Sequence, residues 1–171
     1  MTKSIEQLRR DAKVLRKAYE AGEIHAHQRI LNYPPRTDGA SLKHADYLHV
    51  IAKEQGFVSW PALKFAAEML GMDKATKQQR LKVALYYGQF NVVEQLLVKD
   101  PYLADGDFGL CLGLYRKADI SNMLSEAPHR ATDFLGNLAP PLTMLARSKW
   151  IHQRPDLKDD MLRIAQLLID N

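Results

Sequence analysis

Cysteine is almost absent from this chain of 171 residues, which contains only Cys111. A single cysteine excludes an intramolecular disulfide and a zinc site built from cysteine ligands. Cys111 stands in the apolar run Leu110-Cys111-Leu112, so we expect a small buried hydrophobic residue and not a nucleophile. Nothing in this cysteine usage requires an oxidising compartment.

Long hydrophobic runs are missing too. No segment approaches the stretch of about 18 apolar residues that a transmembrane helix requires. The first residues enter a charged amphipathic pattern directly, without the apolar core of a signal peptide. We therefore expect a cytoplasmic protein with no membrane partner.

The motifs of the common enzyme classes are also absent. The sequence has no Gly-x-Ser-x-Gly elbow, no phosphate loop ending in Gly-Lys-Ser/Thr and no dinucleotide fingerprint after a strand. The spacing of Gly106, Gly109 and Gly113 fits neither glycine motif and predicts a loose turn between repeats. Asp159 and Asp160 are interpreted as acids in the first turn of a helix, and the histidines lack the spacing of metal ligands. We expect no catalysis, no cofactor and no metal.

Charge is present in both signs and is unevenly divided. Residues 1–85 hold 15 Lys and Arg against 9 Asp and Glu, whereas residues 86–171 hold 9 against 11. Arg9, Lys13, Arg16 and Lys17 recur at helical spacing and form one basic stripe. Because acidic residues share that helix, we interpret the stripe as a solvated face. Nucleic-acid binding by this basic half is the alternative function.

Apolar residues recur at the steps of three and four that place them on one helical face. Strand alternation bounded by Asn-Gly or Asp-Gly turns does not occur, which favours an all-α chain. The pattern predicts helices over 5–19, 25–31, 42–52, 59–70, 77–87, 92–97, 110–115, 120–124, 142–150 and 161–169.

The helix pairs repeat with a period of about 33 residues. Gly22 and Gly88 each follow an alanine by four residues and precede a proline by thirteen, and Gly56 follows Ala52 by four. We expect each glycine to end a helix. Aligning Pro128 with Pro101 places Tyr115 at the glycine position of a shorter fourth pair.

Three segments resemble the ankyrin-repeat family. The run 84–97 is similar to its pattern of two small apolar residues, two variable residues, glycine, then Val-Val and Leu-Leu. Pro141-Leu142-Thr143-Met144-Leu145-Ala146 is similar to the start of a unit, followed by an insertion near 150–158 and the run 164–168. The segment 56–61 resembles the leader that precedes ankyrin units in some bacterial proteins.

The resemblance implies an ankyrin-like α-solenoid of about five stacked helix-turn-helix units in one domain. Residues 1–72 would be leader helix pairs and residues 73–171 ankyrin-like units, the last with the insertion. A generic helical bundle or another α-solenoid is the alternative fold.

In this family the two variable residues before the glycine are exposed on the concave side and bind partner proteins. The resemblance therefore implies a protein-interaction scaffold whose partner is a protein. The matching positions are Glu20, Ala21, Glu54, Gln55, Tyr86, Tyr87, Arg147 and Ser148. Tyr and Arg are the residue types enriched at binding hot spots, so Tyr86, Tyr87 and Arg147 are the main candidates, although each tyrosine could equally pack between repeats.

The C-terminal helix carries the apolar residues Ile164, Leu167, Leu168 and Ile169 without a polar capping unit after it. End repeats normally present a polar outer face. We therefore expect either a longer natural chain or self-association through this helix.

Overall fold

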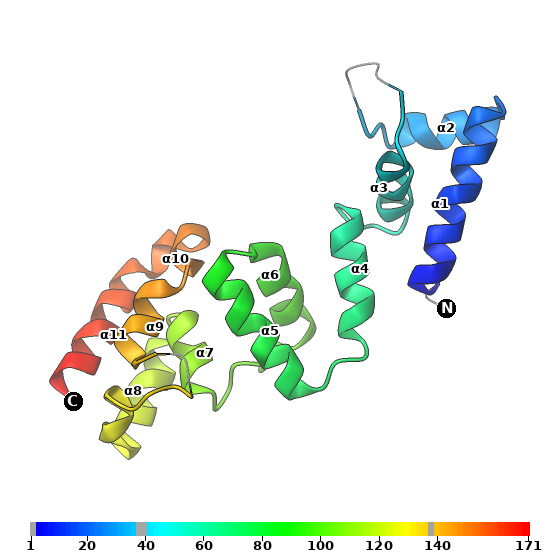
Figure 1. Ribbon diagram of the computed structural model, residues 1–171. Helices are drawn as coiled ribbons and strands as arrows, with labels where there is room; N and C mark the ends of the chain where they lie inside the picture. Colours follow the sequence, from blue (N-terminus) through cyan, green and yellow to red (C-terminus); the bar gives the residue numbers. More distant parts are fainter. Residues whose placement is uncertain (1–2, 37–40, 137–138) are drawn as a thin grey trace. The chain divides into compact units, whose positions relative to one another are not determined.

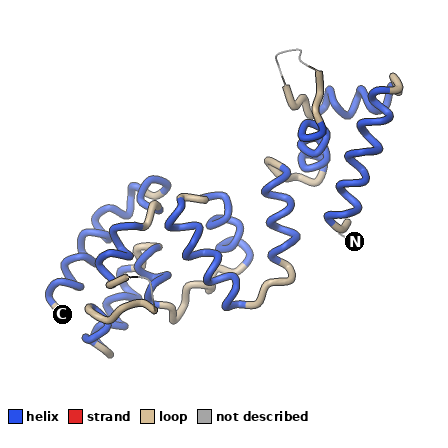
Figure 2. The backbone as a smooth tube through the Cα atoms, viewed as in Figure 1, coloured by secondary structure: helices blue, strands red, loops and turns tan. Residues whose placement is uncertain are grey.

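The computed structural model describes residues 3–36, 41–136 and 139–171. All regular secondary structure in these ranges is helical, and they contain no strand (Figure 2). The prediction of an all-α chain is confirmed. None of the described helices is long and apolar enough to cross a membrane. The chain forms two compact units, Met1–Gly71 and Met72–Asn171, which we call the N-terminal and C-terminal units.

The N-terminal unit is a cluster of helices around one apolar core (Figure 1). Its helices are α1 (Ile5–Glu20), α2 (Ile24–Asn32), α3 (His44–Glu54) and α4 (Trp60–Met69). Helix α3 packs against α1, α2 and α4. The buried side chains follow the predicted apolar spacing, as Leu8, Ala12 and Leu15 of α1 show. At the start of α4, Ser59 caps the helix by accepting a hydrogen bond from the Ala62 amide.

The C-terminal unit contains three successive helix pairs. Its elements are α5 (Lys74–Tyr87), α6 (Phe90–Lys99), α7 (Phe108–Gly113), α8 (Lys117–Glu126), the short helix η1 (Pro128–Ala131), α9 (Pro141–Arg147), α10 (Trp150–Gln153), η2 (Pro155–Leu157) and α11 (Lys158–Asp170). Helix α7 contacts both α5 and α9, and α8 contacts both α7 and α11 (Figure 1). The pairs α5–α6, α7–α8 and α9–α11 therefore follow one another in order.

The first helix of each of four pairs ends in the same way. The φ angle is left-handed at Gly22 (80°), Gly56 (80°), Gly88 (70°) and Tyr115 (57°). The next amide along the chain donates to the carbonyl five residues earlier, at 2.8 to 3.0 Å. This pair of features is a Schellman motif, which satisfies carbonyls that the helix end leaves free. The predicted helix ends at the three glycines are confirmed, and Tyr115 holds the equivalent position despite its side chain.

Two of the three glycines assigned to a loose turn lie in a helix instead. Gly109 and Gly113 are buried in α7, and only Gly106 has the left-handed φ of a turn. A Cβ added to Gly113 would lie 3.0 Å from Leu85 Cδ1. The two glycines therefore allow α5 to approach α7 closely, which composition and spacing did not reveal.

The predicted single helix over 142–150 is wrong. Helix α9 ends at Arg147 and α10 begins at Trp150. Between them the Lys149 amide donates to the Leu85 carbonyl at 3.0 Å, so the chain bonds to α5 and leaves its own helix. Leu85 belongs to the last turn of α5, where carbonyls lack helical partners. The third pair thereby completes the end of a helix in the first pair.

Helix α10 makes two further contacts with the first pair. The ring of Trp150, which is buried, lies 6.1 Å from the ring of Phe90. The Gln153 side-chain amide donates to Glu94 Oε1 at 3.1 Å. The insertion predicted near 150–158 thus packs back on α6, beyond the short middle pair.

Helix α11 buries one side of its apolar surface in its own unit. Ile164 and Leu168 are buried, Leu167 is half-buried, and Leu162 and Ile169 are exposed. The self-association expected for this helix therefore stays a prediction that concerns its exposed side alone.

Candidate interaction groove

A groove of about 330 Å³ lies between α5 and α9 in the C-terminal unit. Seven residues line it, and we call it the α5–α9 groove: Gln79, Lys82, Val83, Tyr86, Tyr87, Met144 and Arg147. The five residues from α5 fall on one side of that helix because their spacing follows the helical repeat. Met144 and Arg147 are one turn apart on α9. Two helices distant in the sequence thus form the two walls.

A small hollow that adjoins the groove is lined by glycine on α7, the helix between the two walls; it shares Lys82, Tyr86, Met144 and Arg147 with the groove. Gly109 and Gly113 of α7 line this hollow between Leu85 and Tyr86 on α5 and Met144 on α9. Side chains larger than hydrogen at these positions would occupy that space. The groove therefore depends on glycine in the middle pair.

The two tyrosines are exposed and held in position by each other. The Tyr86 side chain is 43% exposed and that of Tyr87 is 63% exposed. Their rings lie edge to face with centroids 4.9 Å apart, an arrangement that aromatic pairs prefer. A partner that covers these rings would bury a large apolar area and would order few additional rotamers.

The charge in the groove is positive and only partly compensated. The Lys82 ammonium lies 2.7 Å from the Asp107 carboxylate, and both side chains are largely buried. Arg147 is exposed and makes no ion pair with any described residue. None of the seven lining residues is acidic. Arg147 is therefore the uncompensated cation of the groove.

A second hollow, of about 640 Å³, continues from the first. It shares Gln79, Lys82 and Met144 with the α5–α9 groove and extends to Arg130 and Phe134. Phe134 is exposed. The two hollows together form one surface that an extended segment could follow along α5.

The structure brings three of the predicted site residues together. Tyr86, Tyr87 and Arg147 line the same groove although α7 and α8 separate them in the sequence. Sequence reasoning missed Gln79, Lys82, Val83 and Met144. The helical spacing back from Tyr86 could have identified the three residues of α5. Met144 could not be found in this way because its place depends on how α9 packs.

Ser148 is not exposed, contrary to the expectation from its variable position. Its side chain is 7% exposed, and its hydroxyl donates to the Gly113 carbonyl at 2.6 Å. The Ser148 carbonyl accepts a hydrogen bond from the Tyr115 hydroxyl at 3.0 Å. The equivalent residue in the first pair, Tyr87, stays exposed because α5 continues through it, whereas the chain turns inward at Ser148.

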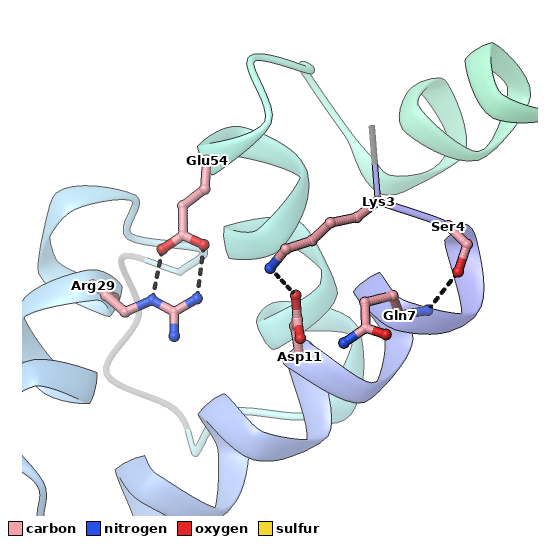
Figure 3. Close-up of polar contacts among 6 residues, drawn as sticks. All are labelled: Lys3, Ser4, Gln7, Asp11, Arg29 and Glu54. Carbon is pink, nitrogen blue, oxygen red and sulfur yellow. Dashed lines mark hydrogen bonds and ion pairs between the residues drawn. The ribbon is translucent and has the colours of Figure 1, made fainter. Parts of the chain in front are cut away.

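The other predicted positions lie in the N-terminal unit. Gln55 and Ala21 are exposed at helix ends. Glu20 pairs with Arg16 one turn earlier at 2.8 Å. Both carboxylate oxygens of Glu54 accept hydrogen bonds from Arg29, each at 2.7 Å, which joins α3 to α2 (Figure 3). Glu54 therefore serves the packing of its own unit.

The basic stripe of α1 is partly compensated as well. Arg9 pairs with Glu6 at 2.7 Å, and Arg16 is the partner of Glu20. Lys13 and Lys17 are exposed. Figure 3 shows a further ion pair, between Lys3, which precedes α1, and Asp11 on α1. Two of the four cations in the stripe thus face a carboxylate of the same helix.

Outside the groove, Cys111 and the two aspartates at the start of α11 lie in surroundings that suit a structural role. Burial raises the pKa of the Cys111 thiol to about 11, so the thiol stays protonated near neutral pH. Asp159 and Asp160 lie in the first turn of α11, as predicted, and Asp160 pairs with Lys117 at 3.4 Å. Among the described residues, no group of three or more His, Cys, Asp or Glu side chains could hold a metal ion.

No family model, no curated protein and no solved structure matches the chain. A function must therefore be inferred from the groove and its chemistry.

Proposed function

We propose that this chain is a protein-interaction module, an ankyrin-like stack of helix pairs that binds a segment of a partner protein in the α5–α9 groove. The observation that carries the proposal is that Tyr86, Tyr87 and Arg147, chosen for their equivalent positions in separate pairs, line one groove. The recurring Schellman motif at the ends of α1, α3, α5 and α7 supports an ankyrin-like repeat.

The side chains of the groove suit binding better than catalysis. Val83, Met144 and the two tyrosines offer apolar contact, and the one uncompensated cation offers an ion pair. The lining contains neither a pair of carboxylates nor a histidine beside a nucleophile, the usual acid–base groups. We place this interaction in the cytoplasm, where a lone thiol such as Cys111 stays reduced.

Site-specific photo-crosslinking tests the location of the binding surface. Tyr87→p-benzoylphenylalanine places the reactive group in the groove, and Val98→p-benzoylphenylalanine places it on α6, where Val98 is 82% exposed. In cells of its own organism, we expect a protein that crosslinks at position 87 and not at position 98. The same protein crosslinked from both positions would contradict the groove as the binding surface.

Calorimetry with the purified crosslinked protein measures the energetic contribution. Truncating a hot-spot residue costs about 2 kcal/mol, or roughly 30-fold in affinity. We expect such losses for Tyr86→Ala, Tyr87→Ala and Arg147→Ala. The matched controls are Tyr102→Ala and Arg163→Ala, exposed residues of the same unit outside the groove. Equal affinity of all five variants would refute the proposal.

A further inference from the structure

We infer that the partner segment is acidic: it places a carboxylate on Arg147 and sets an apolar side chain beside it, against Val83 and Met144. This inference rests on the proposed function, because it specifies the chemistry of a segment bound in the same groove.

The end of the groove near Arg147 carries positive charge that no described acidic side chain compensates. Lys82 already has its carboxylate in Asp107, at 2.7 Å. Arg147 and the adjacent Lys149 are both exposed and pair with no described residue. Lys149 lies over Gly88, where an added Cβ would be 3.2 Å from Lys149 Cδ. Two uncompensated cations therefore lie near the C-terminal end of α5, Arg147 in the lining of the groove and Lys149 over Gly88.

The other end of the surface is balanced and does not call for an anion. Arg130 lines the second hollow together with Asp133, whose carboxylate lies 3.6 Å from the His129 ring. A carboxylate of the partner would meet both signs there. The acidic residue of the segment is therefore assigned to the Arg147 end, and the remainder of the segment runs along α5 past Gln79.

An arginine favours a carboxylate because its planar guanidinium can donate two parallel hydrogen bonds to it. The apolar lining next to Arg147 comes from Val83, from the flexible thioether of Met144 and from the faces of the two tyrosines. A methionine adapts its shape to different apolar side chains. Glutamate or aspartate adjacent to leucine, methionine or phenylalanine fits this lining.

Helix ends provide a simpler explanation for the two cations. Arg147 ends α9 and Lys149 lies beside the end of α5, and cations stabilise the partial negative charge at such ends. That role predicts an effect on folding alone. A role in recognition predicts that the charge at position 147 determines which peptides bind.

A nucleic acid fits the groove less well than a peptide. Phosphate binding depends on neutralising several charges at once, and the Arg147 end offers two uncompensated cations. A single-stranded oligonucleotide is nevertheless included in the test.

The experiment selects short random peptides displayed on phage against the purified full chain. We expect the selected peptides to contain Asp or Glu next to an apolar residue, and to lose affinity about tenfold or more with Arg147→Glu. A fresh selection against Arg147→Glu should favour Lys or Arg in place of the acid. Arg147→Lys should retain part of the affinity, and Arg163→Glu, a matched reversal on α11, should leave it unchanged.

The outcomes separate this inference from the proposed function. The selected peptides could require Tyr86 and Tyr87 but show no acidic preference and bind Arg147→Glu normally. That result would overturn the inference of an acidic segment and would leave the groove as the binding surface. A selection that yields no peptide, or only peptides indifferent to Tyr86→Ala and Tyr87→Ala, would overturn both. Displacement of the peptides by a single-stranded oligonucleotide, with affinity falling steeply as salt is raised, would replace the peptide with a nucleic acid.

Discussion

The two compact units differ in how they hold the residues predicted to contact a partner. In the N-terminal unit the predicted contact residues Glu20 and Glu54 are engaged by Arg16 and Arg29 of the same unit. In the C-terminal unit Tyr86, Tyr87 and Arg147 remain exposed around a groove. The difference originates in the middle pair, whose first helix is short and carries glycine where side chains would fill the space. A helix pair with a short first helix can thus leave room for a groove between the pairs on either side of it.

The largest effect expected is loss of the core that supports this groove. Leu96 of α6 is fully buried. Leu96→Ala should lower the unfolding free energy by about 2 to 5 kcal/mol, because it removes buried apolar surface and leaves a cavity. Urea denaturation, followed by the fluorescence of Trp150 in a Trp60→Phe background, measures the C-terminal unit. Val98→Ala is the exposed control on the same helix, and an equal loss there would mean that the unit lacks a well-packed core.

Filling the small hollow that adjoins the groove should have the next largest effect. Gly113→Leu should destabilise the C-terminal unit by about 1 to 3 kcal/mol, because even a Cβ there would lie 3.0 Å from Leu85. It should also abolish peptide binding. Gly109→Ala is the control in the same helix, since its Cβ would come no closer than 3.4 Å to a neighbour. A Gly113→Leu variant of normal stability and affinity would show that the groove does not depend on the glycines.

The internal polar contacts of the N-terminal unit predict a pH dependence. Burial alone would raise the pKa of Asp46, but hydrogen bonds from the Lys43 amide and from Arg36, with their charges, lower it below the ordinary value of 3.8. The stabilisation that ionised Asp46 provides is therefore present above the ordinary pKa, and it disappears as the pH falls through the lowered pKa. At neutral pH, Asp46→Asn should cost about 1 kcal/mol, because the amide keeps an acceptor for the Lys43 N–H but loses the ion pair with Arg36.

The measurement is the difference in unfolding free energy between wild type and Asp46→Asn across the acidic range. Other carboxylates titrate in both proteins, so the difference isolates Asp46. A gap that stays constant below the ordinary aspartate pKa would contradict the assignment of these contacts as stabilising.

The smallest effect is expected at the groove surface. Tyr86→Ala and Tyr87→Ala should each change the unfolding free energy by no more than about 0.5 kcal/mol, as substitutions at exposed positions usually do. Thermal melting of each variant beside Tyr102→Ala provides the comparison. If Tyr86→Ala melts well below the other two, Tyr86 belongs to the packing between pairs and its contribution to binding must be reassigned.

Local signals made much of the fold predictable. Apolar spacing and the glycines at 22, 56 and 88 determine where helices run and end, because both act within a few residues. The same alignment located Tyr115, although a tyrosine with φ of 57° carries no local signal of a helix end. The backbone cost there, about 1 kcal/mol or more, is offset by burial of the ring and by the bond to the Ser148 carbonyl.

Tertiary contacts determined what could not be predicted. The break after Arg147 occurs because Lys149 and Ser148 bond to α5 and α7, which lie far away in the sequence. The role of Gly113 depends on the approach of α5 and is invisible in the spacing of glycines. For the candidate site, equivalent positions identified which residues are variable, but only packing decided that Arg147 is exposed and Ser148 is buried.

The bond from the Lys149 amide to the Leu85 carbonyl has a consequence for cooperativity. A stack of repeats behaves as a linear array in which each element is coupled only to its neighbours, so fraying can begin at either end. Together with the Trp150–Phe90 contact, this bond couples the third pair directly to the first pair, past the middle one. Loss of the last pair would then weaken the first pair directly, and the three pairs should melt as a single transition in place of fraying from the end.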